Sequence, residues 1–294
     1  MIQVPMSEGV DVLSDWAEAS CVFDPQGFVS RSEVASALDN SGIPNVDDVV
    51  GSIWLEISRR HSLAQMTHPV VCRQDGLEKA LGDDAFRAYA FQLLLSLASY
   101  YPSMRMDAKT RRKVTKLFER VTASALTGYL RMCSVEITGF PREDSVPRPF
   151  RQCLDYLARK LHEKRGSTQV FSSNTKDEGV DVVAWQPFND KRPSQLILLA
   201  QCATGRNWRG KTSQIMPDVW RNYVNWLAGP AKAFAFPFVG MPDEWDRLSF
   251  QAGILLDRLR ISSMLAASGR NSRVRREIKD SITWLSRSLR PLQQ

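Results

Sequence analysis

With 294 residues, the chain can form one large domain or two ordinary ones, and its 43% hydrophobic and 24% charged residues are typical of a globular protein with a sizeable core. The formal net charge of +7 suits a polyanionic partner such as nucleic acid. Five scattered cysteines without a CxxC pair argue against a disulfide framework and a zinc knuckle, and favour free thiols in a reducing cytoplasm. Neither a signal peptide nor an apolar run long enough for a membrane span is recognisable. We therefore expect a cytoplasmic protein without a membrane partner.

The first half of the chain has helical periodicity. Helical patterns cover residues 10–19, 30–38, 46–60, 84–101 and 107–130. Ser30 and Glu33 have the spacing of a capping box, which satisfies two backbone donors at a helix start. The segment 84–101 is so apolar that we expect a central, nearly buried helix. These patterns predict an α-helical N-terminal domain over residues 1–145.

The pattern changes after residues 139–149, which contain three prolines and a glycine and form the clearest linker. Helical stripes follow at 150–163, 220–227, 243–265 and 273–289, and short apolar strands at 179–185, 195–204 and 231–240. Strands separated by a helical crossover imply parallel pairing within a mixed sheet. The sequence thus predicts an α/β domain over residues 146–294, in which helices flank a mixed central sheet.

The first two predicted strands each carry one polar residue where a buried strand should have none. Asp181 lies between Val180 and Val182, and Gln201 follows the apolar residues 196–200. A buried carboxylate without a partner is costly, so it is either paired or used to hold a cation. A carboxylate and an amide oxygen form the kind of all-oxygen set that Mg²⁺ accepts. The alternative is a strand-end Asp and a solvated hairpin Gln.

The segments DEGVDVVAW (177–185) and QLILLAQCATG (195–205) contain Gly-x-Asp on one strand and Gln near the end of the next. This arrangement resembles the PD-(D/E)XK restriction-endonuclease-like core, and in particular its Mrr-like branch, which has Gln in place of the acidic residue. The resemblance covers about residues 148–240. It implies hydrolysis of phosphodiester bonds, usually of DNA, with Mg²⁺ (or Mn²⁺). It also implies that Asp181 and Gln201 are metal ligands and the Cys202 backbone carbonyl a third.

One position departs from the family pattern. The family's lysine falls two residues after the Glu or Gln, and Ala203 stands there. The small side chain leaves space for a cation from elsewhere, and Lys211, near the start of the following helix, is the best candidate for the catalytic cation. Lys176 and Arg206 are weaker substitutes.

Two further acidic residues are candidates for a metal site. Glu178 could bind a second metal, although its charged neighbours favour a solvated turn. Glu163 could act as the helix glutamate that some Mrr-like proteins use, although a solvated side chain is the simpler interpretation.

Basic residues near the proposed centre favour binding of nucleic acid. Arg206, Arg209 and Lys211 surround Trp208, so they could contact phosphates while the indole stacks on a base. A second basic set lies in the C-terminal tail: Arg270, Arg273, Arg275, Arg276, Lys279, Arg287 and Arg290. It forms either a phosphate-binding surface or the solvated face of a helix that packs on the domain.

These observations favour a metal-dependent nuclease that cleaves DNA, acting in bacterial restriction or phage defence with a partner subunit. The main alternative is a catalytically degenerate nuclease fold that serves as a nucleic-acid-binding or scaffold subunit. A purely protein-interacting module is the third possibility.

Overall fold

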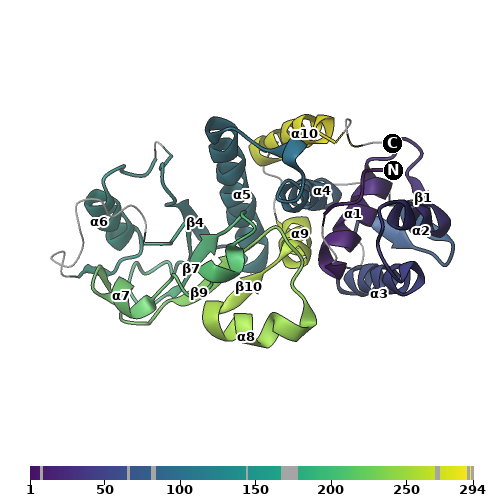
Figure 1. Ribbon diagram of the computed structural model, residues 1–294. Helices are drawn as coiled ribbons and strands as arrows, with labels where there is room; N and C mark the ends of the chain where they lie inside the picture. The colour runs from purple at the N-terminus through teal and green to yellow at the C-terminus, as the bar shows by residue number, and fades with distance from the viewer. Residues whose placement is uncertain are drawn as a thin grey trace.

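The computed structural model describes residues 1–6, 9–64, 67–80, 84–143, 145–166, 178–268, 272–289 and 292. Three residues considered above, Lys176, Arg270 and Arg290, lie outside these ranges. Within them, helices surround a five-stranded mixed sheet, which confirms the predicted α/β class (Figure 1).

The central sheet has the strand order β10-β9-β7-β6-β4. Its strands are β4 (Ser134–Ile137), β6 (Val182–Gln186), β7 (Leu196–Cys202), β9 (Ala231–Ala235) and β10 (Ile254–Leu256). β4, β6 and β7 pair antiparallel, whereas β7, β9 and β10 pair parallel. The parallel pairing of β7 with β9 confirms the prediction from the crossover between them.

Side chains of β6 and β7 alternate between two apolar layers, as the pleat requires. Val182 and Ala200 pack in the layer that includes α5 (Ala108–Tyr129), whereas Val183 and Leu199 pack with α6 (Phe150–Lys160). The two helices therefore cover opposite faces of the sheet. Both faces are buried, which explains why these strands are continuously apolar in sequence.

Four of the predicted helices lie in the N-terminal part: α1 (Val10–Val22), α2 (Arg31–Asn40), α3 (Val46–Ala64) and α4 (Asp84–Leu97). The capping box is confirmed, because the Glu33 N–H donates to Ser30 Oγ at 3.1 Å and the Ser30 N–H donates to Glu33 Oε2 at 2.7 Å. The prediction that the N-terminal part contains only helices is wrong. A small sheet of order β1-β3-β2 is formed by β1 (Phe28–Ser30), β2 (Val70–Cys72) and β3 (Gly76–Lys79), whose strands are too short to show alternation in sequence.

The predicted boundary at residue 145 does not coincide with the layers of the structure. Both α5 and β4 precede it, yet β4 is an outer strand of the central sheet and α5 packs on β4, β6 and β7. One apolar cluster contains side chains from Ile2 to Leu289. The helix that contacts the Asp181 strand therefore comes from the part assigned to the N-terminal domain.

Two predicted helical stripes are interrupted. Residues 243–265 form α8 (Pro242–Ala252), β10 and α9 (Arg258–Ala267), because Gly253 adopts φ +77° and turns the chain into a strand. Residues 220–227 contain only the end of α7 (Pro217–Arg221) before β8 (Val224–Asn225), which pairs with β5 (Lys164–Arg165). The C-terminal stripe is confirmed as α10 (Ser272–Arg287). The 3-10 helix η2 (Pro102–Met104) lies between α4 and α5, and η3 (Trp208–Lys211) lies between β7 and α7.

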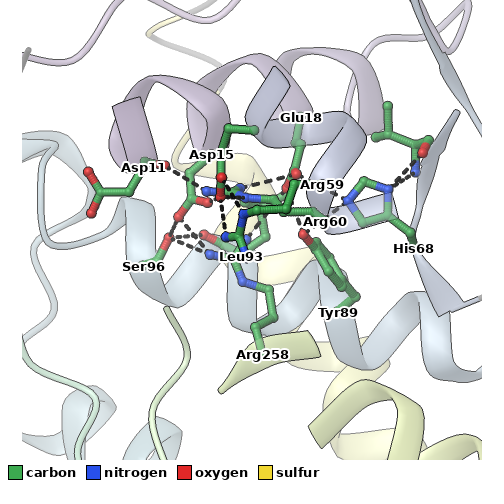
Figure 2. Close-up of polar contacts among 12 residues, drawn as sticks. Asp11, Asp15, Glu18, Arg59, Arg60, His68, Tyr89, Leu93, Ser96 and Arg258 are labelled. Atoms are coloured by element: carbon green, nitrogen blue, oxygen red, sulfur yellow. Dashed lines mark hydrogen bonds and ion pairs between the residues drawn. The ribbon is translucent and has the colours of Figure 1, made fainter. Parts of the chain in front are cut away.

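A buried ionic network connects the N-terminal helices to the start of α9 (Figure 2). The two oxygens of Asp15 on α1 contact Arg60 of α3 and Arg258 of α9, each at 2.7 Å. Both guanidinium side chains are fully buried. Arg258 Nε also donates to the Pro237 carbonyl oxygen at 3.0 Å, next to the end of β9.

Glu18 extends the same network on α1. Its carboxylate contacts Arg60 at 3.1 Å and His68 Nε2 at 3.2 Å, and it accepts a hydrogen bond from the Tyr89 hydroxyl at 2.9 Å. Burial acts to raise the pKa of Glu18, but Arg60 and His68 outweigh it and the pKa is lowered overall. The carboxylate is therefore ionised in the core, where only its partners make the charge tolerable.

Replacing Arg258 with methionine should lower the free energy of unfolding by about 3–5 kcal/mol, because Asp15 keeps its buried charge and loses one of its cations. Urea denaturation near neutral pH measures the change. The matched control is Arg151→Met on the exposed face of α6, which should change stability by about 0.5 kcal/mol or less. Equal losses in the two variants would show that the network contributes nothing specific.

Candidate metal centre

Asp181 lies at the edge of the sheet where β6 begins and β7 ends. Its N–H donates to the Ala200 carbonyl oxygen at 2.9 Å, and its Oδ2 accepts the Cys202 N–H at 2.8 Å. An open pocket of about 520 Å³ lies there, lined by Glu178, Gly179, Asp181, Gln201, Cys202, Lys211, Gln214 and Met216. The structure therefore brings together all four residues that the sequence predicted for the metal and the catalytic cation.

Gln201 presents an unsatisfied oxygen at this pocket. Its residue is only 5% exposed, and its Nε2 donates to Gln214 Oε1. Its Oε1 is buried and has no hydrogen-bond partner among the residues that the structure describes. A buried acceptor left unsatisfied costs about 1–3 kcal/mol. A bound cation would satisfy this oxygen, as the predicted role of Gln201 requires.

A second carboxylate, Glu119 of α5, lies beside Asp181. A Cβ atom on Gly139 would lie 2.6 Å from Asp181 Oδ1 and 2.7 Å from Glu119 Oε2. The two carboxylates therefore converge on the backbone of Gly139. Backbone N–H groups of Thr138 and Gly139 donate to the Asp181 carbonyl oxygen at 2.8 and 3.0 Å, which holds this turn against the site.

Sequence reasoning missed Glu119, although the sequence contains a signal for it. The residue is 3% exposed and lies among Leu117, Phe118 and Val121 on a helix whose other charged residues are more exposed. An acidic residue within the apolar part of an amphipathic helix has the same significance as an Asp on a buried strand. The assignment of this helix to a separate domain concealed the connection.

The charge of the two carboxylates affects the residue next to them. Burial, and then the negative charges of Asp181 and Glu119, raise the pKa of the Cys202 thiol well above its usual range. Lys116 offsets part of this charge, since its Nζ lies 2.6 Å from Glu119 Oε2 and donates to the Gly139 carbonyl oxygen at 2.5 Å. Cys202 is thus a neutral thiol, and only its backbone is suited to a metal.

The donor atoms at this edge fit Mg²⁺ or Mn²⁺. Two carboxylates, one amide oxygen and a backbone carbonyl form an all-oxygen set, and Mg²⁺ commonly binds through one or two carboxylates, with water and phosphate completing its shell. No group of three or more His, Cys, Asp or Glu side chains suited to a metal occurs in the described ranges.

Ala203, where the family that the sequence resembles has its lysine, is enclosed. Ala203 is 1% exposed and packs in an apolar cluster with Trp208, Phe234 and Phe236. The predicted gap beside Ala203 is thus filled by aromatic rings. Lys211 lines the pocket from η3 instead.

The predicted nucleic-acid contacts next to the pocket are only partly accessible. Trp208 is 1% exposed and stacks on Phe236 with the ring centroids 4.2 Å apart, so its predicted role as a base-stacking surface is wrong. Arg209 is held by two hydrogen bonds to Glu244, at 2.7 and 2.6 Å. Arg206 lies over the Tyr100 ring at 4.9 Å.

The two other acidic candidates lie in different places. Glu163, expected to be solvated, is 8% exposed, and it accepts the N–H groups of Ser194 and Leu227 at 3.0 and 3.4 Å. Its carboxylate therefore accepts backbone hydrogen bonds, and the helix glutamate near Asp181 is Glu119. Glu178 lines the pocket with Asp181, and its binding of a second metal stays a prediction.

Comparison with known proteins gives no relative for this chain. No protein-family model, no curated protein and no solved structure matches it. No helix within the described ranges is both long and apolar enough to cross a membrane. The site must therefore be argued from its own residues.

Gly139→Ala should abolish the stabilisation that Mn²⁺ gives, because the added methyl group would displace both carboxylates. A ligand that binds only the folded state raises the melting temperature, so the measurement is the shift in melting temperature on adding Mn²⁺. The matched control is Gly51→Ala, where an added Cβ meets nothing within 4 Å. An undiminished shift in Gly139→Ala would contradict this geometry.

Proposed function

We propose that this protein is a Mg²⁺-dependent nuclease with a restriction-endonuclease-like core that hydrolyses phosphodiester bonds of DNA. The observation that carries the proposal is the convergence of Asp181 and Glu119 on Gly139, at the sheet edge where the Gln201 side chain has an unsatisfied oxygen and lines a pocket with Asp181. Carboxylates held this close repel each other, and a divalent cation offsets that repulsion. The open pocket leaves room for a phosphate.

The order of elements around the pocket supports the same fold. α5 is followed by the antiparallel strands β4, β6 and β7, and then by β9, parallel to β7. This succession agrees with the core that the sequence resembles, with α5 rather than α6 as the helix that supplies a glutamate. Ala203 occupies the strand position where the family has its lysine. In this proposal Lys211, on η3, supplies the positive charge instead.

Each residue at the pocket has a separate task in this proposal. Asp181, Glu119 and Gln201 would hold the cation, which when bound acts as a Lewis acid toward the phosphate and the attacking water. Lys211 offsets the charge that develops on the phosphate. Lys116 fixes the orientation of Glu119 against the Gly139 carbonyl.

A catalytically degenerate nuclease fold is the second candidate function. The burial of Ala203 among aromatic rings favours it, because the usual lysine has no space there. Such a protein would act as a nucleic-acid-binding or scaffold subunit. In both cases we propose a place in restriction or phage defence, with a partner subunit, on the strength of the family resemblance alone.

Asp181→Ala and Glu119→Gln should each lower the rate of DNA cleavage by about 10²-fold or more, since each removes charge from the metal centre. The assay follows cleavage of plasmid and linear DNA with Mg²⁺ or Mn²⁺. Glu163→Gln is the control, because it keeps the size of a buried acidic side chain that lies outside the pocket. If Glu163→Gln lost activity and Glu119→Gln did not, the assignment of Glu119 as the metal-binding glutamate would be wrong.

Lys211→Ala should lower cleavage by about 10²-fold, the scale on which single charge-stabilising groups act. Lys211→Arg should recover little, because a planar guanidinium does not replace a compact ammonium. Full activity in Lys211→Ala would exclude this role. A wild-type protein that binds DNA but cleaves none with either metal would support the degenerate alternative.

A further inference from the structure

The first half of α5 presents a stripe of cations. Lys109, Arg112, Lys113 and Lys116 have the spacing i, i+3, i+4 and i+7, which places them on one face of the helix. Lys109, Arg112 and Lys113 are exposed, and Lys116 is half-buried. The opposite side of the helix packs in the core through Val114, Leu117, Phe118 and Val121.

The exposed part of this stripe is not paired with carboxylates. Within the described ranges, Lys109, Arg112 and Lys113 form no ion pair. Some basic residues elsewhere are paired, as Arg209 is with Glu244 and Arg273 is with Glu277. The exposed cations of the stripe are therefore available to an external anion.

The stripe is unfavourable for the helix on its own. Lys109 in the first turn opposes the helix dipole by about 0.3–1 kcal/mol, and like charges at i and i+4, such as Lys109 and Lys113, cost about 0.2–0.5 kcal/mol. Asp107, the N-cap, is the acidic residue at this end of the helix. The attraction of a polyanion lying along the stripe would offset these repulsions.

The stripe ends at the candidate metal centre. Lys116 contacts Glu119 and the Gly139 carbonyl, and Thr115 lies 3.5 Å from Thr204 (Oγ1 to Oγ1), just past the end of β7. The pocket at this edge is lined by Asp181 and by Gln201, whose side-chain oxygen has no hydrogen-bond partner among the described residues. From Lys109 to Lys116 the helix rises roughly 10 Å, which is about the axial rise of three base pairs of duplex DNA.

We propose that the stripe Lys109–Arg112–Lys113–Lys116 is the surface that binds the DNA backbone and leads one phosphate to Glu119 and Asp181. This inference rests on the proposed function for the choice of partner. Arg105, Arg111 and Arg206 line an adjacent groove of about 300 Å³, which widens the basic surface. None of the exposed large apolar side chains belongs to residues 105–116, so the surface suits a phosphate backbone rather than a membrane.

The test measures binding of fluorescently labelled duplex DNA by anisotropy, in EDTA, so that binding is separated from cleavage. Arg112→Glu/Lys113→Glu should weaken binding about tenfold or more and lower the slope of log K against log salt by about 2, near 0.9 for each lost phosphate contact. Both side chains are exposed and unpaired among the described residues, so this variant should remain folded.

The matched control is Arg151→Glu/Arg159→Glu, two exposed arginines of α6 across the sheet. It changes the net charge equally and should alter affinity by less than about twofold, because no phosphate contact is lost there. Equal weakening in both variants, or none in either, would overturn the proposal. It would also be overturned if the wild-type protein bound vesicles of anionic lipid but no duplex DNA. If the protein bound DNA through the stripe but cleaved none, the proposed nuclease activity would be refuted, and the assignment of the stripe as the DNA-binding surface would stand.

Discussion

The Asp15 carboxylate, held between the buried guanidiniums of Arg60 and Arg258, is the interaction on which the arrangement of the chain depends. Each of these charges would cost several kcal/mol in the core without the others, so α1, α3 and α9 can only be buried together. α9 in turn packs along α5, the helix that carries Glu119. The N-terminal helices thus support the helix that carries Glu119 to the candidate metal centre, which agrees with the single apolar cluster that contains both.

At the other side of α5, the constraint is the absence of a side chain at Gly139. Its backbone lies between two carboxylates that no larger residue would allow to approach. The proposal gives this one helix two tasks. Its buried face supplies a ligand and its exposed face supplies cations, and Lys116 lies where the two meet.

Two kinds of sequence signal predicted parts of the fold and of the candidate site. Asp181 and Gln201 are polar residues at the ends of apolar strands. The Ser30–Glu33 spacing marks a helix start through local hydrogen bonds. Glu119 escaped prediction because helical periodicity does not tell which sheet a helix covers. β10 has three residues, too few for a pattern. Trp208 among arginines has the same sequence whether it is exposed or, as here, buried against Phe236.

The central claim is that Asp181, Glu119 and Gln201 form a divalent-metal site. Titration of the protein with Mn²⁺, followed by electron paramagnetic resonance, tests it without reference to activity or DNA. We expect one bound ion in the wild-type protein. We expect none in the double variant Asp181→Asn/Glu119→Gln, in which both carboxylates become neutral amides of nearly the same size. Unaltered Mn²⁺ binding in the double variant, or no binding by the wild type, would contradict it.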